Sequence, residues 1–382
     1  LIPFLLHECD HELPGTRETG CEVAGISGYA PSKSVMRLVQ HYFPSFTPMR
    51  RAKHRLPIVF LALMGSAGSV TFTPTSDLDL WVGVERQKLT PEELLLYEEK
   101  LRCIEAWVAR SFEIEMHLFM ADPSRIRSND YGDLVGESCG SALGKLLKDE
   151  FYRTAVFLQG RFPLYWLMPV GITDMQYERN IAALRLNPEF PADSFVDLGH
   201  VNTIAAGEFF GAALWHLLKA LSAPFKSLLK LAVLDMYACP EWDRRPLCER
   251  HKEQILSGRS AAAADPHLFM VEKLREFYAG PDGGATRSLI EECFLVHNLL
   301  RTGRGARNEK ARVEYFVQFG RRWEYDRTQV TRLAGYREWN YIERERLHSR
   351  LVAYLAGTYL RIRRRTVQSS IRISDKDLTV AA

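Results

Sequence analysis

The segment from Met64 to Val84 places the tightest constraint on the fold. A short apolar run, 58–63, leads into the small residues Gly65 and Ser66, and residues 75–82 then alternate between polar and apolar side chains. Alternation of this kind predicts a strand, because successive side chains of a strand point to opposite faces. The predicted strand carries Asp77, Asp79 and Trp81 on one face and Leu78, Leu80 and Val82 on the other.

Two carboxylates on one strand face repel each other unless a cation lies between them. Oxygen ligands at this spacing suit Mg²⁺ or Mn²⁺, commonly completed by substrate phosphates. The Gly65-Ser66 turn offers close backbone approach and a hydroxyl for those phosphates. For Asp77-Leu78-Asp79 alone, an edge strand with two solvated aspartates is the better interpretation. The whole arrangement favours a metal-dependent nucleotide site.

A third carboxylate is expected from a second alternating run, 112–120. Ile114, Met116, Leu118 and Met120 would share one face, and Glu113, Glu115, His117 and Phe119 the other. Acids on an otherwise apolar strand are unusual unless they are solvated or bind something. A solvated face explains Glu113 well, and Glu115 is the candidate third acid.

These residues resemble a known family. Gly65-Ser66 followed by Asp77-Leu78-Asp79 is similar to the signature of DNA polymerase beta-type nucleotidyltransferases, and more narrowly the chain resembles the class I adenylate cyclases of gamma-proteobacteria. Residues 208–219, Glu-Phe-Phe-Gly-Ala-Ala-Leu-Trp-His-Leu-Leu-Lys, are similar to that family's Glu-Tyr-Phe-Gly-small-small-Leu-Trp-x-Leu-Tyr-Lys, with Phe209 and Leu218 in place of tyrosines. The segments 149–156 and 224–226 add to the resemblance, which is weakest in 1–55 and 240–382.

The resemblance implies an α+β fold, with a nucleotidyltransferase-type mixed sheet and helices followed by a largely α-helical domain. It implies that ATP is converted to 3′,5′-cyclic AMP and pyrophosphate, with Asp77, Asp79 and Glu115 holding two Mg²⁺ or Mn²⁺ ions. Two alternatives stay open. One is a nucleotidyltransferase that moves a nucleoside monophosphate to a separate acceptor, and the other is a non-catalytic binding module.

Further residues are candidate substrate contacts: Gly65, Ser66, Ser69, Ser76, Arg153, Lys219 and Lys226. Lys219, Lys226 and Lys230 fall near one line of a helix, which would suit a triphosphate. A solvated lysine face is the alternative, and the family context is what favours the two named lysines. Arg153 instead pairs with Asp149, four residues earlier, if its role is structural.

Composition argues against several classes of protein. The 50 basic and 47 acidic residues give a net charge of +3, too mild to indicate a nucleic-acid partner. The seven cysteines show no CxxC spacing, so neither zinc nor a disulfide framework is indicated and a reducing, cytoplasmic setting fits best. No apolar run is long enough to span a bilayer. Since the chain begins at Leu1 rather than Met, it is interpreted as a fragment. The family resemblance implies that the chain ends before a C-terminal regulatory half.

Three parts are predicted for the 382 residues: an N-terminal segment, 1–55, a catalytic core, 56–125, and a mainly helical domain, 126–382, that completes the nucleotide site. Thr90-Pro91 with Glu93 predicts a strong helix start. Two helices, or one kinked at Pro224, are expected between Thr203 and Tyr237, with a core stripe of Leu214, Leu217, Leu218, Leu221, Phe225, Leu228 and Leu229. The polar loop 128–141 is a candidate substrate contact, and the basic stretch 301–312 is a candidate flexible loop. The basic stretch 361–365 suggests an acidic contact, although such a run is usually solvated.

Overall fold

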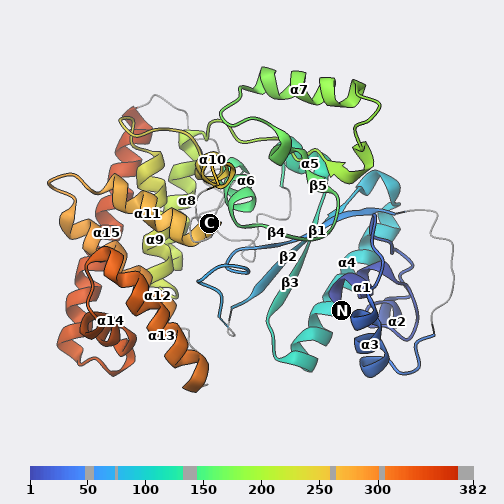
Figure 1. The fold of residues 1–382 in the computed structure, drawn as a ribbon, viewed down its shortest axis with the longest axis horizontal. Coiled ribbons are helices and arrows are strands. Elements are labelled where there is room, and N and C mark those ends of the chain that lie inside the picture. The colour runs from blue at the N-terminus through green and yellow to red at the C-terminus, as the bar shows by residue number, and fades with distance from the viewer. Residues whose placement is uncertain (48–55, 74–75, 132–143, 259–263, 301–305, 369–382) are drawn as a thin grey trace. The chain divides into compact units, whose positions relative to one another are not determined.

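The computed structural model describes residues 1–47, 56–73, 76–131, 144–258, 264–300 and 306–368 (Figure 1). Contacts between residues divide the chain into two compact units. The first comprises 1–67, 77–140 and 150–202, and the second comprises 68–76, 141–149 and 203–382. The three-part division predicted from the sequence stays a prediction.

The first unit is built on a four-stranded sheet with the order β3-β2-β1-β4 (Figure 1). Its strands are β1 (Ile58–Met64), β2 (Leu78–Val84), β3 (Met116–Ala121) and β4 (Val156–Gly160). β1 pairs antiparallel with β2 and β4, whereas β2 and β3 are parallel. The long helix α4 (Pro91–Phe112) makes the crossover that a parallel pair requires.

Helix α4 begins as predicted. Thr90 accepts a hydrogen bond from the Glu93 backbone, and the Glu93 side chain accepts one from the Thr90 backbone, which completes a capping box. The helix buries Tyr97, Leu101, Ile104 and Val108 against one face of the sheet. The N-terminal helices α1 (Ile2–His7) and α3 (Lys33–Tyr42) contribute to the same core, and the short helix α2 (Thr16–Thr19) contacts α4.

The strand predicted over 112–120 starts later than expected. Helix α4 continues to Phe112, and Glu113 ends it in a left-handed conformation with φ +55°. β3 therefore begins at Met116, and Glu113 and Glu115 precede it. On the opposite face of the sheet, Trp81 stacks on Phe151 of helix α6 (Gly144–Thr154) with ring centroids 4.5 Å apart.

The first unit contains three further kinds of element: a short helix, a small second sheet and a longer helix. Helix α5 (Pro123–Arg127) is capped by Asp122. A two-stranded parallel sheet joins β5 (Phe162–Pro163) to β6 (Phe195–Val196), and helix α7 (Asp174–Leu186) lies between them in sequence. The helical region that the sequence indicated from residue 160 onward is thus interrupted by short strands.

The second unit is helical. Its helices are α8 (Ala206–Lys219), α9 (Pro224–Tyr237), α10 (Leu247–Leu256), α11 (Pro266–Phe277), α12 (Gly284–Leu300), α13 (Ala306–Gly320), α14 (Arg327–Ala334) and α15 (Tyr341–Gln368). The break at Pro224 separates two helices, α8 and α9. A mixed sheet with helices followed by a largely helical region confirms the predicted α+β class.

The predicted core stripe across α8 and α9 is wrong in two places. Phe225, Leu228 and Leu229 are buried, but Leu218 and Leu221 are 49% and 90% exposed. The phenylalanines and small residues of the Glu-Phe-Phe-Gly-Ala-Ala segment fill the core instead, because they occupy the face of α8 turned toward α9 and α15. No described helix has the length and apolarity needed to cross a membrane.

Candidate active site

Strand register gathers the predicted site at one end of the four-stranded sheet. Met64, the last residue of β1, pairs with Asp79 of β2. The Gly65-Ser66 turn that follows Met64 therefore lies beside the start of β2, where Asp77 stands one residue before the strand. On the other side of β2, Asp79 pairs with His117 of β3.

Asp79 lies within β2 and Asp77 stands one residue before it, so the shared face of the two aspartates stays a prediction. Both side chains are partly exposed. The opposite face, with Leu78 and Leu80, packs into the hydrophobic core of the first unit. Asp79 is thus held by a strand whose other face packs into a core, and Asp77 directly precedes that strand.

The backbone of Glu115 is hydrogen-bonded to the residue between the two aspartates. Its carbonyl oxygen accepts a hydrogen bond of 3.0 Å from the Leu78 backbone N–H, so β2 and β3 are joined between Asp77 and Asp79. Its side chain is 74% exposed, and its Oε1 lies 3.3 Å from Nε2 of His117.

The carboxylates of this region have the donor chemistry of a divalent-ion site. Carboxylate oxygens suit Mg²⁺ or Mn²⁺, which proteins often bind through one or two carboxylates plus substrate phosphates. Among the described residues, no three His, Cys, Asp or Glu side chains gather closely enough to hold a metal ion. Asp77 and Asp79 fit the donor chemistry, and the role of Glu115 as third ligand stays a prediction.

The Gly65-Ser66 turn has a backbone that favours glycine. Gly65 has φ +93°, and a Cβ at this position would meet no atom within 4 Å. The Gly65 N–H donates to Thr154 Oγ1 at 3.2 Å, and Thr154 Oγ1 donates to the Glu150 carbonyl at 2.9 Å. The last turn of α6 therefore fixes the turn beside the aspartates.

A testable consequence follows for Gly65. Replacing Gly65 by Ala forces a left-handed conformation on a residue with a Cβ, which costs about 1–2 kcal/mol. Gly20 offers a matched control, since it has φ +66° and equally open surroundings. We expect Gly65→Ala and Gly20→Ala to lower the melting temperature similarly, and only Gly65→Ala to lower turnover, by roughly tenfold. Equal turnover of the two variants would remove the turn from the site.

Two predicted contacts, Ser69 and Ser76, make hydrogen bonds within the connector between β1 and β2. Ser69 Oγ lies 2.8 Å from Thr71 Oγ1, and Ser76 Oγ lies 3.1 Å from both the backbone N and Oγ1 of Thr73. This connector, residues 68–76, belongs to the second unit. Their role toward a substrate stays a prediction.

The basic candidates differ in their surroundings. Arg153 is only 7% exposed, whereas Lys219 and Lys226 are exposed on α8 and α9. Lys219 Nζ lies 5.6 Å from the centre of the Trp215 ring. Asp149, the alternative partner of Arg153, accepts hydrogen bonds from the Tyr237 hydroxyl at 2.9 Å and the Cys248 backbone at 2.7 Å.

Two residues of this region make contacts that the sequence does not predict. The alternation of 112–120 puts His117 on the same face as Glu115, and the structure shows their side chains 3.3 Å apart. Thr154 gave no signal, because its contact with Gly65 joins residues 89 positions apart. Most of the polar loop 128–141 lies outside the described residues.

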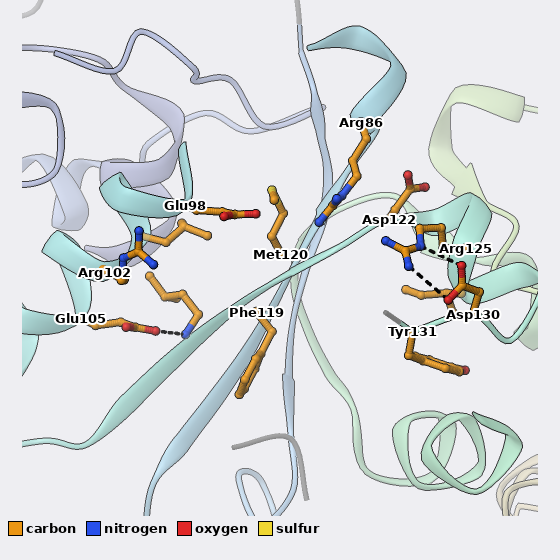
Figure 2. Close-up of a pocket in the computed structure, with 13 residues that line it drawn as sticks. Arg86, Glu98, Arg102, Glu105, Phe119, Met120, Asp122, Arg125, Asp130 and Tyr131 are labelled. Carbon is orange, nitrogen blue, oxygen red and sulfur yellow. Dashed lines mark hydrogen bonds and ion pairs between the residues drawn. The ribbon is translucent and has the colours of Figure 1, made fainter. Parts of the chain in front are cut away.

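Figure 2 shows a cavity of about 200 Å³ elsewhere in the first unit. It opens along β3 between α4 and α5, with Glu98 and Arg102 on one side and Arg125 and Asp130 on the other. Arg125 and Asp130 form a two-pronged ion pair of 3.0 and 3.1 Å. None of the predicted site residues lines this cavity.

Comparison with known proteins places both parts of the chain in the same class. Residues 1–166 match a family model described as the adenylate cyclase NT domain, and residues 204–381 match one described as the class-I adenylate cyclase second domain. Both family models describe adenylate cyclases. More narrowly, the chain belongs to the class I adenylate cyclase family, as the sequence resemblance predicted.

Individual relatives support this membership. The chain is 29% identical over 377 residues to the adenylate cyclase of Salmonella typhimurium and 28% identical to that of Escherichia coli K12, in each case over 98% of this chain and 44% of the relative. It is 30% identical over 370 residues to that of Haemophilus influenzae, over 94% of this chain and 43% of the relative. It thus spans less than half the length of these relatives. No solved structure matches the chain.

Proposed function

We propose that the chain is the catalytic part of an adenylate cyclase, which converts ATP to 3′,5′-cyclic AMP and pyrophosphate. The observation that carries the proposal is the register of β1 and β2. It sets the Gly65-Ser66 turn beside Asp77 and Asp79 in a chain of the class I family.

Each residue would have a distinct role. Asp77 and Asp79, with Glu115 beside them, would hold two Mg²⁺ or Mn²⁺ ions. When bound, such ions lower the pKa of an attacking hydroxyl and stabilise the oxygens of a leaving phosphate. The turn at Gly65 would bind the pyrophosphate portion through its backbone and the Ser66 hydroxyl.

The reaction requires little more of the protein than orientation. The ribose 3′-hydroxyl and the α-phosphate belong to one molecule, so the site must fold the ribose back over the phosphate and align the two for in-line attack. His117 would position Glu115, since their side chains lie 3.3 Å apart. Arg153, Ser69, Ser76, Lys219 and Lys226 remain proposed contacts to the substrate.

The test is incubation of the chain with ATP and Mg²⁺ alone. We expect equal amounts of cyclic AMP and pyrophosphate, and no product after the divalent ions are chelated. Pyrophosphate that appears only when an acceptor is added would establish the nucleotidyltransferase instead. Free ADP or AMP without a cyclic product would contradict both.

The same proposal extends to the rest of the protein. The predicted C-terminal regulatory region would occupy the length of the relatives that this chain does not match, and the protein would act in the cytoplasm. Comparing the activity of this chain with that of a protein of the relatives' full length would measure what the additional length contributes.

A further inference from the structure

The connector between β1 and β2, residues 68–76, is held by side chains that are far away in the sequence. It comes shortly after the Gly65-Ser66 turn and belongs to the second unit, as do Asp265 and Arg312. The Val70 backbone N–H donates to Asp265 Oδ2 at 2.7 Å, and the Val70 carbonyl accepts from Arg312 Nη2 at 2.8 Å. Both backbone polar groups of Val70 are therefore bound from outside the connector.

Arg312, on helix α13, makes a second contact with the connector. Its Nη1 donates to the Phe72 carbonyl at 3.1 Å, so its two Nη atoms bind carbonyls two residues apart. Its Nε donates to the Asn298 carbonyl at 2.9 Å, and its guanidinium carbon lies 5.4 Å from the centre of the buried Phe316 ring. A guanidinium presents its donors in a fixed planar fork, so these contacts hold the connector in one orientation.

Asp265 combines its contact with the connector and a second, structural one. Its Oδ1 accepts hydrogen bonds of 2.9 Å from the backbone N–H groups of His267 and Leu268, which caps helix α11. The Val70 side chain packs against the core of the second unit, and Thr71 is only 5% exposed. Connecting segments usually run exposed over a protein surface, whereas this one is bound through its backbone and its side chains.

The bound carbonyls are close in sequence to the proposed site. Val70 comes four residues after Ser66, and Phe72 comes five residues before Asp77. Segments this short span at most about 13–18 Å, so a displaced connector changes the positions that Ser66 and Asp77 can take. A misplacement of about 1 Å in a catalytic arrangement can lower a rate by about a hundredfold.

We propose that Arg312 and Asp265 are positioning residues for the proposed reaction. By holding the connector, they fix the course of the chain between Ser66, at the phosphate-binding turn, and Asp77, at the metal site. This role rests on the proposed function, since Ser66 and Asp77 matter to catalysis only if the chain acts as a cyclase.

The first measurement is hydrogen exchange in peptides covering 68–73, which does not depend on activity. Arg312→Met removes the guanidinium and keeps an unbranched side chain. We expect exchange in this segment to become about tenfold faster, because hydrogen bonds of charged groups contribute stability of that order. Arg337→Met is the matched control, since the exposed Arg337 donates to the Leu300 carbonyl at 3.0 Å, outside the connector. Equal exchange in the two variants overturns the proposal.

The second measurement is the rate of cyclic AMP formation at varied ATP and Mg²⁺ concentrations, at a temperature where every variant is folded. For Arg312→Met we expect kcat to fall by about tenfold or more while KM for ATP changes by less than about threefold. Arg312→Lys should recover part of the loss, since an ammonium group can bind one carbonyl but cannot fork across two. A merely structural contact would lower the melting temperature alone, so an unchanged kcat in Arg312→Met overturns the proposal.

Asp265→Asn tests the other half of the clamp. An amide has one acceptor oxygen, which can serve the α11 cap or the Val70 N–H but not both. We expect kcat to fall here as well, and the double variant with Arg312→Met to lose less than the product of the two losses, because both residues hold Val70. An unaltered chain that makes cyclic AMP, with variants that match it, contradicts the positioning role alone. An unaltered chain that makes none contradicts the proposed function and the positioning role together.

Discussion

Replacing Asp79 by Asn is expected to lower the Mg²⁺-dependent production of cyclic AMP by a factor of at least about a thousand. Asp79 stands at the centre of the site, paired in register with Met64 on one side and His117 on the other. Asparagine keeps the size and the hydrogen-bonding shape of the side chain but removes the charge that a divalent ion requires. Initial rates of cyclic AMP formation over a range of Mg²⁺ concentrations provide the measurement.

The control for this variant is Glu113→Gln. Glu113 is an exposed carboxylate near Glu115, but it ends helix α4 and does not belong to a strand. We expect its neutralisation to leave the rate within about twofold, as is usual for surface substitutions away from a site. If Asp79→Asn keeps most of its activity while Glu113→Gln behaves as expected, the aspartates are structural and the metal assignment is wrong.

Glu115→Gln in the same assay decides the third ligand. A loss approaching that of Asp79→Asn would mean that the exposed Glu115 side chain reaches the ions when substrate is bound. A rate near that of Glu113→Gln would leave two carboxylates, with the remaining ligands supplied by phosphate and water.

The sequence predicted correctly those features that interactions between neighbouring residues determine. The capping box at Thr90 and Glu93 is complete within four residues, and α4 begins there. The alternation of 75–82 likewise predicted that Leu78, Leu80 and Val82 pack into a core. Neighbouring residues fix both features, so one sequence is enough to recognise them.

Features that depend on contacts between residues distant in sequence were not predicted correctly. The end of α4 and the start of β3 are set by how the crossover returns to the sheet, and the predicted strand therefore began too early. The leucines at 218 and 221 have the spacing of a core stripe, but α9 and α15 cover another face of α8.

The basic run at 361–365 is a further example. The sequence suggests an acidic contact for this run, with a solvated run as the more usual interpretation. The exposed Arg363 and Arg364 fit the solvated interpretation, whereas Arg361 and Arg365 both bind Asp235 of α9, 126 and 130 residues away in sequence, each at 2.8 Å. A single sequence cannot reveal a pairing over such a separation, because nothing local selects Asp235 among the acids.

Asp235→Asn is expected to destabilise the second unit more than any surface charge change. Asp235 is 2% exposed and also accepts a hydrogen bond of 2.6 Å from the Tyr278 hydroxyl. Burial raises the pKa of Tyr278 well above its usual value, so this hydroxyl stays a donor. Removing the charge leaves both guanidinium groups without their shared carboxylate and weakens the attachment of α15 to α9.

The cost is smaller than for a fully buried ion pair, because Arg361 and Arg365 are 43% and 28% exposed and regain water. We expect a loss of about 2–3 kcal/mol in the free energy of unfolding, below the 3–5 kcal/mol typical of fully buried pairs. In a unit of this size that corresponds to a fall in melting temperature of about 4–12 °C. Thermal unfolding followed by circular dichroism measures it.

Glu314→Gln is the matched control, since Glu314 pairs with Arg327 at 2.7 Å but both side chains are exposed, and we expect a change below about 0.5 kcal/mol. Arg365→Met combined with Asp235→Asn tests the coupling. The double variant should lose less than the sum of the two single losses, because each substitution removes the same interaction. Additive losses would mean that the charges do not act together and that apolar packing alone holds α15 on α9.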